Sequence, residues 1–302
     1  MADPGIYYLQ NHQIDKQAWD ECLRKSANGL IYGYTYYLDS LCSWDGIIMD
    51  DYKAVMPLPW RKKYGIRYVY PPAFVQQLGV FSSLHLEQNT ITAMLELGKK
   101  YFRFGEYFFN YGNRVEHGVP KTNYILDLRS TYEEIKSRYK TVLVKNLKKA
   151  AKHPVRYITT DDYRHAVNLS GKTYGHRIPH VKGQDYLNFI GLCSVLSSKN
   201  QLVIRELKNG DDLLASVLLL NDNRRLYLLL STTTKQGRPL EAAHYLIDSV
   251  IREFAGRQLL LDFEGSDIAG IAYLYESFGA LNQPYHFHRW NNLPWPLRLL
   301  KK

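Results

Sequence analysis

The most constraining feature of this chain is a change of hydrophobic period between Leu259 and Ala280. Residues 259 to 263 form a short apolar run followed by a glutamate and a glycine, which predicts a buried strand with polar groups at its carboxyl end. The next apolar residues recur at i, i+3, i+4 and i+7, so they share one face of a helix. They are Ile271, Leu274, Tyr275 and Phe278, and Gly279 ends that helix. A strand, an acidic turn and a helix in succession indicate an α/β fold.

The end of this helix carries a resemblance to a known family. Residues 274 to 280 read Leu-Tyr-Glu-Ser-Phe-Gly-Ala, which resembles the Tyr-x-x-x-Gly helix after the fifth strand of GNAT-type acyltransferases. The preceding Asp-Phe-Glu-Gly-Ser, in a chain of 302 residues, resembles more closely the Fem-type branch, whose double-GNAT members are related to peptidoglycan aminoacyltransferases. The resemblance implies an α/β (α+β) protein of two tandem GNAT-like domains, each a mixed, mainly antiparallel sheet flanked by helices.

A second segment carries the same resemblance in the first half of the chain. Strand-like runs at 53–58 and 66–70 surround the basic turn 61–65, and Pro-x-Phe-x-Gln-Gln-Leu-Gly follows at 72–79, as in Fem-like sequences. Tyr70, Gln76 and Gln77 are therefore candidates for substrate binding, although weaker ones than the acidic turn.

The segment from Thr131 to His153 predicts one long basic helix, with Thr131 as its N-cap and Pro154 as its stop. Eight basic residues and no acidic residue lie between positions 135 and 156. A solvated face is the ordinary explanation, but like charges one turn apart repel unless an anion relieves them. Lys145-Asn146-Leu147-Lys148-Lys149-Ala150 resembles the Lys/Arg-Asn-Leu-x-x-Ala pattern of the Fem-type connecting helix. The resemblance implies that this helix borders the substrate groove, where Lys145, Lys148 and Lys149 would hold the phosphates of the donor.

The order of predicted elements in the first half recurs in the second half. Two strand pairs around basic turns, 54–70 and 215–230, occupy corresponding places and form a faint internal repeat. We place the domain boundary inside the basic helix, near Ala151. The expected domains are residues 1–150 and 151–302.

The loop from Ser231 to Pro239 opens a predicted helix and is a candidate phosphate cradle, because free amides and the helix dipole point outward there. Gln236, Gly237 and Arg238 match only part of the Gln/Arg-x-x-Gly-x-Gly/Ala loop of GNAT enzymes that use acyl-CoA, since the second small residue is missing. Fem-type enzymes tolerate this departure, because the resemblance implies an aminoacyl-tRNA donor. The donor therefore stays open between acyl-CoA and aminoacyl-tRNA.

The acidic turn supplies the candidate catalytic groups. Glu264 could take a proton from an attacking amine or hold its ammonium form, whereas Asp262 is expected to bond nearby backbone. The resemblance implies that Tyr275 protonates the leaving thiolate of coenzyme A, and the alternative is a core tyrosine. Arg177 is a candidate for gripping a phosphate or carboxylate. His176 and His180 beside it have no further ligand at metal spacing, so no metal site is expected.

Composition narrows the partners and the compartment. The formal net charge of +10 favours an anionic partner. Three cysteines without ligand spacing suggest a reducing compartment, and neither a leader nor a membrane-spanning run is expected, so the prediction is a cytoplasmic protein. The tail from Trp290 to Lys302 mixes apolar and basic residues. It could rest at the inner face of a membrane, but packing onto the domain is the preferred interpretation.

The sequence thus predicts an acyltransferase that moves an acyl or aminoacyl group to an amine, without a metal or a permanently bound cofactor. The relation to peptidoglycan aminoacyltransferases implies an amine-bearing acceptor such as a cell-wall or lipid-linked precursor. Two alternatives stay open. One is an ordinary acetyl-CoA-dependent N-acetyltransferase, and the other is a non-catalytic module that binds RNA or another anion through the basic helix.

Overall fold

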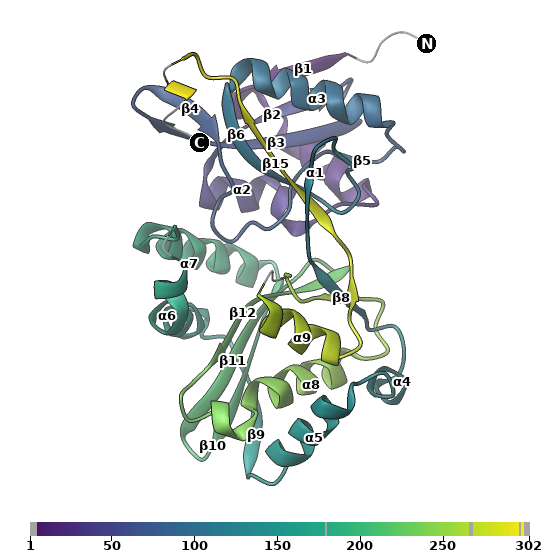
Figure 1. Cartoon of the computed structure of the whole chain (residues 1–302), viewed down its shortest axis with the longest axis vertical. Coiled ribbons are helices and arrows are strands. Elements are labelled where there is room, and N and C mark those ends of the chain that lie inside the picture. Colours follow the sequence, from purple (N-terminus) through teal and green to yellow (C-terminus); the bar gives the residue numbers. More distant parts are fainter. Residues whose placement is uncertain (1–4, 179, 266–267, 296, 299–302) are drawn as a thin grey trace. The chain divides into compact units, whose positions relative to one another are not determined.

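A computed structural model describes residues 5–178, 180–265, 268–295 and 297–298 of the chain (Figure 1). The chain divides into two compact units. Unit 1 comprises residues 1–121 and 284–302, and unit 2 comprises residues 122–283. Each unit contains one mixed sheet with helices packed against it, as the resemblance implied.

Unit 1 is built on an eight-stranded sheet in the order β1-β2-β3-β4-β6-β15-β7, with β5 paired to β3. All neighbours are antiparallel except β4 and β6, which pair in parallel at Val69 and Gly105. Its strands are β1 (Ile6–Leu9), β2 (Ser43–Met49), β3 (Ala54–Lys63), β4 (Ile66–Val69), β5 (Phe81–Ser82), β6 (Phe104–Phe109), β7 (Val119–Lys121) and β15 (Tyr285–Asn291). Its helices are η1 (Asn11–Gln13), α1 (Lys16–Lys25), η2 (Ile31–Gly33), α2 (Thr35–Leu41) and α3 (Gln88–Tyr101).

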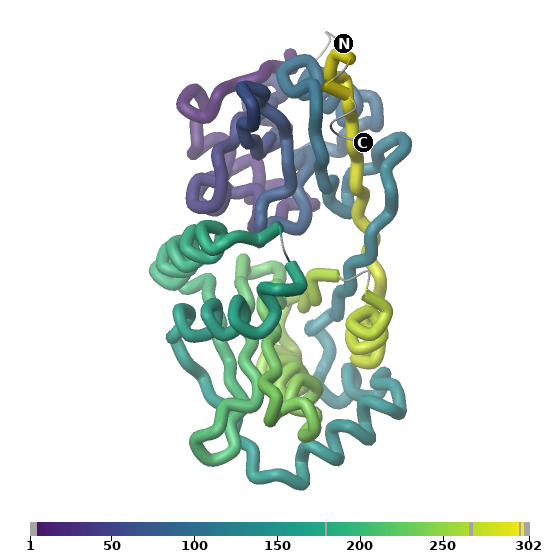
Figure 2. Tube along the Cα trace, turned by 60° about the vertical axis from the view of Figure 1, so that its left-hand side comes forward, coloured from purple at the N-terminus to yellow at the C-terminus, as the bar shows by residue number. Residues whose placement is uncertain are grey.

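The core of unit 1 follows from amphipathic helices packed on this sheet. Helix α1 begins after Asp15, because the Asp15 carboxylate accepts bonds from two amides of its first turn. The buried face of α1 carries Trp19, Cys22 and Leu23. Strand β15 runs beside β6, as Figure 2 shows for the yellow C-terminal segment, and buries Trp290, whose indole Nε1 donates to the Phe102 carbonyl at 2.6 Å. That part of the tail thus packs on the domain, whereas Trp295 is exposed and residues 299–302 lie outside the described residues.

Unit 2 is built on a seven-stranded sheet in the order β14-β8-β13-β12-β11-β10-β9. Strands β12 and β13 pair in parallel, and their other neighbours pair antiparallel. Its strands are β8 (Tyr124–Asp127), β9 (Val155–Thr160), β10 (Leu202–Asn209), β11 (Asp212–Asn221), β12 (Arg225–Thr233), β13 (Leu260–Asp262) and β14 (Leu281–Asn282). Its helices are α4 (Tyr132–Lys136), α5 (Thr141–Ala150), α6 (Tyr163–Tyr174), η3 (Gly175–Arg177), α7 (Gly183–Ser198), η4 (Arg238–Leu240), α8 (Ala242–Phe254) and α9 (Ala269–Ser277).

The two sheets have the same plan. Each has four successive antiparallel strands, a helical crossover to a parallel fifth strand, and an antiparallel sixth strand. The crossover helix is α3 in unit 1 and α8 in unit 2. The hairpins β3–β4 and β11–β12 occupy corresponding places, which agrees with the internal repeat expected from residues 54–70 and 215–230.

The division of the chain differs from the predicted boundary at residues 150 and 151. Strand β8 forms backbone pairs with β13 and β14, and α5 packs on α8, so the segment before residue 151 belongs to unit 2. Strand β15 pairs with β6 and β7, so the end of the chain belongs to unit 1. These partners lie more than one hundred residues from each strand, and periodicity within a short window carries no signal for them.

The predicted single basic helix is two helices, α4 and α5. The Thr131 cap of α4 is present as expected, with Glu134 completing a capping box. The chain then turns, because the Tyr139 hydroxyl bonds Asp248 at 3.0 Å and the Lys140 amide donates to the Ser277 carbonyl at 2.9 Å. Burial of Tyr139 against α8 therefore overrides the continuous helical pattern. One consequence is that Val142, near the start of α5, is 38% exposed.

Candidate active site at the end of strand β13

The turn after β13 holds Glu264 in an unusual backbone conformation. Glu264 has φ of 64° and Gly265 has φ of 36°, and a left-handed glutamate is strained. The Asp262 carboxylate accepts from the Glu264 amide at 3.0 Å and holds the start of this turn. The sequence did not predict the strain, although an acidic residue followed by glycine is the usual sign of a tight turn.

The Glu264 carboxyl group is buried and incompletely satisfied. Its Oε1 atom is buried and has no hydrogen-bond partner within the described parts of the chain. Burial raises the pKa of Glu264 to about 8, because the charged form loses its hydration. A carboxyl group with these properties can exchange a proton near neutral pH, which most surface glutamates cannot do.

Tyr275 on α9 lies beside this carboxyl group. Its ring stacks on Phe263 at 4.7 Å between centroids, and Phe263 in turn stacks on Phe278 at 5.9 Å. Burial raises the pKa of the Tyr275 phenol, and the nearby Glu264 charge raises it further. The phenol therefore stays protonated at neutral pH. The structure thus brings together the two residues that the sequence singled out as catalytic.

Asp262 forms a buried ion pair with Arg225, which the sequence analysis did not identify. The Arg225 Nη1 to Asp262 Oδ2 distance is 2.8 Å, and the side chains are 6% and 1% exposed. The pair joins the first residue of β12 to the last residue of β13. Asp262 is thus committed to structure, and of the two carboxylates described in this turn Glu264 is the one that is available for chemistry.

Gly265 lies against the backbone that enters unit 2. A Cβ atom at Gly265 would be 1.9 Å from the Thr122 carbonyl oxygen and 2.9 Å from the Asn123 Cα. The Phe263 amide donates to the Tyr124 carbonyl at 2.8 Å beside this contact. Glycine is therefore required here by close approach as well as by φ, and it fixes the position of the neighbouring Glu264.

Strand β12 continues well beyond its pairing with β13. The parallel pairing ends at Tyr227 and Asp262, whereas β12 extends to Thr233. A register shift opposite Leu218 and Leu219 leaves Leu229 as an extra residue in β12. Such a β-bulge bends a strand. In the described part of unit 2, the end of β12 thus has no strand neighbour on the β13 side.

The loop predicted as a phosphate cradle is partly occupied by its own contacts. The Thr234 hydroxyl accepts from the Gly237 amide at 3.1 Å, and the Gly237 carbonyl accepts from the Ala242 amide at 3.1 Å. Gly237 is buried against the Leu214 carbonyl, whereas Gln236 and Arg238 are exposed. The short helix η4 and a left-handed Glu241 then precede α8. Gly237 therefore shapes the loop and does not offer its amide to a ligand.

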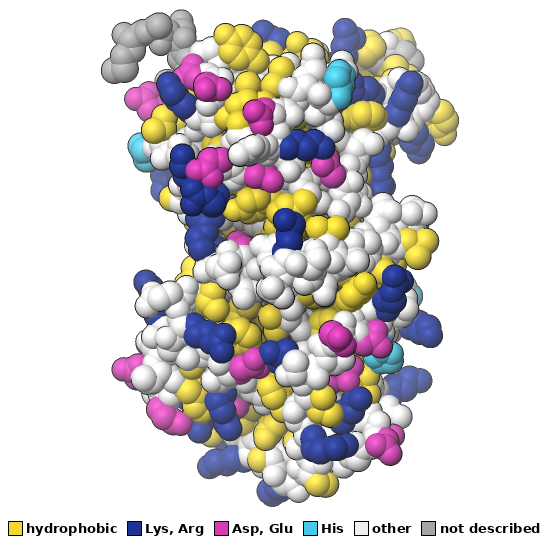
Figure 3. All heavy atoms as spheres, turned by 180° about the vertical axis from the view of Figure 1, so that it is seen from behind, with side chains coloured by type: hydrophobic (Ala, Val, Ile, Leu, Met, Phe, Trp, Pro, Cys, Tyr) yellow, Lys and Arg dark blue, Asp and Glu magenta, His cyan; other side chains and the backbone are white. Residues whose placement is uncertain are grey.

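The predicted donor-binding lysines lie on α5 close to this loop. Lys149 pairs with Glu241 at 3.0 Å, just before the first residue of α8. Lys145 and Lys148 are exposed, and no ion pair or hydrogen bond is seen for either among the described residues. Figure 3 shows that lysine and arginine side chains on the face it presents alternate with carboxylates and do not form one patch. No described contact joins the three lysines to Glu264 or Tyr275.

Arg177 lies near the far end of β12. Its guanidinium sits 5.2 Å from the Tyr174 ring centroid, and the Tyr174 hydroxyl contacts the backbone of Thr233. His176 and His180 are exposed in the same segment. The described residues contain no group of three or more histidine, cysteine or acidic side chains that could hold a metal ion.

Tyr70 and Gln76 belong to unit 1. They line a cavity of about 10 Å³, which is room for at most a single water molecule. The Arg61 guanidinium lies over the Tyr70 ring at 4.1 Å, and the Gln76 side chain accepts from Gln77 at 2.7 Å. This cavity alone does not form a substrate pocket.

Comparisons with solved structures identify the fold. No protein-family model and no curated protein sequence matches the chain. Crystal structures do: FemX matches with a TM-score of 0.65 and 12% identity, covering 98% of this chain and 99% of FemX. The chain has the tandem GNAT-like fold. A tandem GNAT protein from the clavulanic acid biosynthesis pathway matches with a TM-score of 0.56 and 10% identity, covering 96% of this chain and 99% of that one.

A third match extends the set of proteins with this tandem GNAT-like fold. The C-terminal domain of a putative lysylphosphatidylglycerol synthetase from Agrobacterium fabrum has a TM-score of 0.55 and 7% identity, covering 95% of this chain and 94% of that one. The likeness to Fem-type proteins expected from the two sequence segments is therefore confirmed as a likeness of fold. None of the described helices combines the length and apolarity that crossing a membrane requires.

Proposed function

We propose that this protein transfers an acyl or aminoacyl group to an amine, with Glu264 as the base. One observation carries the proposal: Glu264 lies on a strained turn beside the Tyr275 phenol, and its buried Oε1 has no hydrogen-bond partner among the described residues. Strain and an unsatisfied buried carboxyl are unfavourable for folding, and both are typical of functional sites. The tandem GNAT-like fold supports the proposal, because proteins described as GNAT enzymes share it.

The proposed step uses both residues. The amine nitrogen of the acceptor attacks the carbonyl carbon of the donor, and Glu264 takes the proton that this nitrogen loses. The bond from the carbonyl carbon to sulfur or to ribose oxygen then breaks, and the Tyr275 phenol supplies the proton for that leaving group. A carboxylate whose pKa is about 8 is well matched to an amine near neutral pH. Positioning supplies much of the remaining rate increase.

The donor is either an acyl-CoA or an aminoacyl-tRNA, and features of unit 2 support each. The unpaired end of β12 offers backbone groups to an extended donor such as the amide-containing arm of coenzyme A. The loop around Gly237 has one amide fewer for a pyrophosphate, because Thr234 occupies it. The exposed Lys145 and Lys148 suit a polyanion such as tRNA.

Turnover with both donor classes tests the proposal. The purified protein is incubated with a panel of acyl-CoAs, a panel of charged tRNAs and several amine acceptors, and the acylated amine is detected by mass spectrometry. We expect Glu264→Gln to lower the rate by about 10²- to 10⁴-fold and Tyr275→Phe to lower it less, as general acid–base catalysis predicts. Because Glu264 acts as the deprotonated base, kcat/KM should rise with pH up to about 8.

Two conservative variants serve as controls. Tyr273→Phe changes an exposed tyrosine on α9, and Glu276→Gln changes a carboxylate that is paired with Lys140 at 2.9 Å. Both should keep nearly full activity. Absence of turnover with every donor, or full activity of Glu264→Gln, would contradict the proposal.

The exposed lysines of α5 favour a second candidate, a module that binds RNA without catalysis. It predicts tRNA affinity that falls steeply with salt and does not depend on Glu264. Lys148→Ala should lower the slope of log affinity against log salt by about one. Such binding without any turnover would favour this candidate over the acyltransferase.

A further inference from the structure

The hairpin between β3 and β4 extends beyond the sheet of unit 1. Strand β2 pairs with β3 only as far as Trp60, and β4 pairs with β6 only at Val69. Residues 61–68 pair with each other across the hairpin, and in the described part of unit 1 they have no further strand neighbour. They therefore form a two-stranded ribbon that projects from the sheet, as the hairpin labelled β4 does in Figure 1.

The turn at the tip of this ribbon holds an aromatic residue where a smaller one is favoured. Tyr64 and Gly65 join the two strands with φ of 50° and 80°, as in a type I′ turn. Asparagine, aspartate and glycine tolerate this left-handed conformation, whereas a tyrosine is strained in it. The Tyr64 side chain is 89% exposed, so packing does not offset the strain. Contact with a partner would account for a tyrosine at this position.

The ribbon is positively charged. It carries four basic residues and no acidic one, and the sequence has no aspartate or glutamate from position 53 to position 86. Lys62 and Lys63 are exposed beside the tip, and neither forms an ion pair among the described residues. Neighbouring like charges repel one another unless an anion relieves them, so the tip favours an anionic partner.

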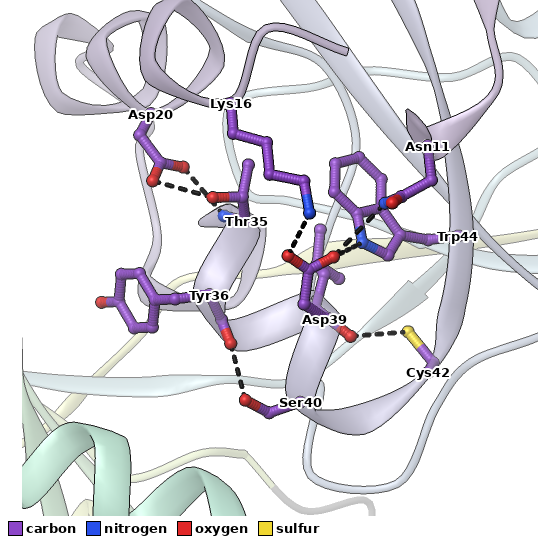
Figure 4. A network of polar contacts seen from close by, with 10 residues as sticks. Asn11, Lys16, Asp20, Thr35, Tyr36, Asp39, Ser40, Cys42 and Trp44 are labelled. Carbon is purple, nitrogen blue, oxygen red and sulfur yellow. Dashed lines mark hydrogen bonds and ion pairs between the residues drawn. The ribbon is translucent and has the colours of Figure 1, made fainter. Parts of the chain in front are cut away.

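Two carboxylates near the base of the ribbon already have other partners. Asp39 and Asp45 line one cavity together with Trp60. The Asp45 carboxylate pairs with the Arg67 guanidinium, which also stacks on the Trp60 ring at 4.0 Å. Asp39 pairs with the Lys16 ammonium group at 2.6 Å, as Figure 4 shows. These carboxylates therefore anchor the base of the ribbon and do not neutralise the lysines at its tip.

A second exposed aromatic residue, Trp295, leaves the sheet at the same end as the ribbon. Strand β4 runs parallel to β6, so the residues before Val69 lie beyond the start of β6. Strand β15 runs antiparallel to β6 and reaches Asn291 opposite Phe104, so the residues that follow lie beyond the same end. Figure 1 shows the hairpin and the yellow segment after β15 on this side. Trp295 is 79% exposed, second only to Tyr64 among the large apolar side chains described.

The segment that leads into β6 adds further exposed groups to this end. Tyr101, the last residue of α3, is 54% exposed, and Lys100 and Arg103 are exposed beside it. The Asn292 amide donates to the Arg103 carbonyl at 2.6 Å, which joins this segment to the chain after β15. Three separate segments thus bring aromatic rings and cations to one end of the sheet. We call it the aromatic–basic end, and its residues are Lys62, Lys63, Tyr64, Tyr101, Arg103 and Trp295.

We propose that the aromatic–basic end docks on a membrane surface that contains anionic lipids. Tyrosine and tryptophan rings favour the boundary between headgroups and acyl chains, and lysine and arginine attract anionic headgroups. An RNA strand fits this end less well, because bases stack on open aromatic rings. Along the ribbon the Arg61 guanidinium covers the Tyr70 ring at 4.1 Å, and the Tyr68 ring lies 6.1 Å from that of Phe104. The proposal is independent of the acyl transfer, since it uses no residue of unit 2.

Vesicles of two compositions test the proposal on the full-length protein. One kind contains phosphatidylcholine alone, and the other contains phosphatidylcholine and phosphatidylglycerol. Co-sedimentation should show binding to the anionic vesicles that is about tenfold tighter or more and that weakens with added salt. Tryptophan emission should shift to the blue on these vesicles, and Trp295→Phe should remove most of that shift. Equal binding to both kinds of vesicle would overturn the proposal.

Two double variants with the same loss of charge test the role of the ribbon. Lys62→Ala combined with Lys63→Ala should weaken binding to anionic vesicles about fivefold for each lysine, as expected for cations close to the lipid surface. Lys152→Ala combined with Lys172→Ala removes two exposed lysines of unit 2 and should bind like the parent. An equal loss in both double variants would mean that net charge alone attracts the protein, and it would overturn the assignment of this surface.

The sharpest test is Tyr64→Asn, which removes the ring and introduces a residue that the left-handed turn favours. It should weaken vesicle binding about three- to tenfold, because one ring no longer enters the interface, and it should keep or raise the urea midpoint. Weaker binding at undiminished stability separates docking from a folding defect. Unchanged vesicle binding by this variant would overturn the proposal. So would a protein that ignores vesicles and instead uses Tyr64 to bind tRNA or to form a dimer.

Discussion

The fifth strands of the two units have the same neighbours and end in opposite ways. In unit 2, β13 ends at Asp262 and leads to Glu264, a half-buried glutamate with a buried carboxyl oxygen in a strained turn. In unit 1, β6 ends at Phe109 and leads to Asn110, a neutral amide. Asn110 accepts from the Gly112 amide at 2.9 Å and from the Asn28 side chain at 3.1 Å. The end of the fifth strand thus leads to an ionisable glutamate in unit 2 and to a hydrogen-bonded asparagine in unit 1.

The parallel pairs before these ends differ as well. Strand β12 extends beyond its parallel pairing with β13, so the backbone at its end has no strand partner on that side in the described part of unit 2. Strand β4 instead ends at Val69, the one residue through which it pairs with β6. The partner of Val69 is Gly105, and a Cβ atom there would be 2.2 Å from the Trp290 ring. Aromatic packing therefore fills unit 1 where unit 2 keeps polar groups. A repeated topology sets where a site can form, and the side chains at each strand end decide whether it does.

The largest effect on the free energy of unfolding should come from breaking the buried ion pair between Arg225 and Asp262, for which the described end of β6 in unit 1 has no counterpart. Asp262→Ala leaves the Arg225 guanidinium buried and unpaired, which should lower the free energy of unfolding by about 3–5 kcal/mol. Asp127→Ala breaks the exposed pair with Arg129 and should lower it by about 1 kcal/mol or less. Urea denaturation of both variants measures the difference. Equal losses of stability would mean that the buried pair of Arg225 and Asp262 matters no more to folding than an exposed ion pair.

The second effect is a pH dependence of stability that originates in unit 2. The pKa of Glu264 is about 8 in the folded chain and near 4.5 when unfolded, so the folded state holds the proton more tightly. Its contribution is fully present below pH 4.5 and declines as the pH rises to about 8. Glu264→Gln should remove this decline and be more stable than the parent at pH 9 by several kcal/mol, because each unit of the pKa shift corresponds to about 1.4 kcal/mol.

Denaturation at pH 5 and pH 9 measures that change. The exposed Glu116→Gln in unit 1 should leave the pH dependence of the parent unchanged. A Glu264→Gln variant that follows the parent at both pH values would show that the carboxyl group is hydrated in solution.

The smallest of the three effects concerns the turn itself. Gly265→Ala should cost about 2–3 kcal/mol, because the new methyl group meets the Thr122 carbonyl and adds to the cost of positive φ. Gly256 also has positive φ, 78°, with no atom within 4 Å of its Cβ position, so Gly256→Ala should cost about 1 kcal/mol. The difference in the urea midpoint isolates the contact from the strain. No difference would mean that the crossing backbone does not hold the turn.

Much of this fold was predictable because its signals are local. The period of apolar residues located α9, the strand-like runs located the pairs in 54–70 and 215–230, and Thr131 identified the start of α4. The acidic turn and Tyr275 were identified from a short motif. The sequence did not predict β1, β2 or β15, or the break before α5. These depend on distant partners, such as Ser277 for Lys140 and Phe102 for Trp290.

The candidate site was predictable only in its residue types. The glutamate, the tyrosine and the basic residues were identified, but their environments were not. The turn that positions Glu264 depends on the close approach of Gly265 to the backbone at Thr122, which is 143 positions earlier in the chain than Gly265.

The exchange of strands between the units has a consequence for biosynthesis. Every described strand of unit 2 is translated before Tyr285–Asn291, so the strand that completes the sheet of unit 1 is the last of the described strands to be made. In the amino-terminal part of unit 1, one edge of β6 therefore stays unpaired until β15 has been made. During this interval its exposed edge is the part of the nascent chain most in need of a chaperone.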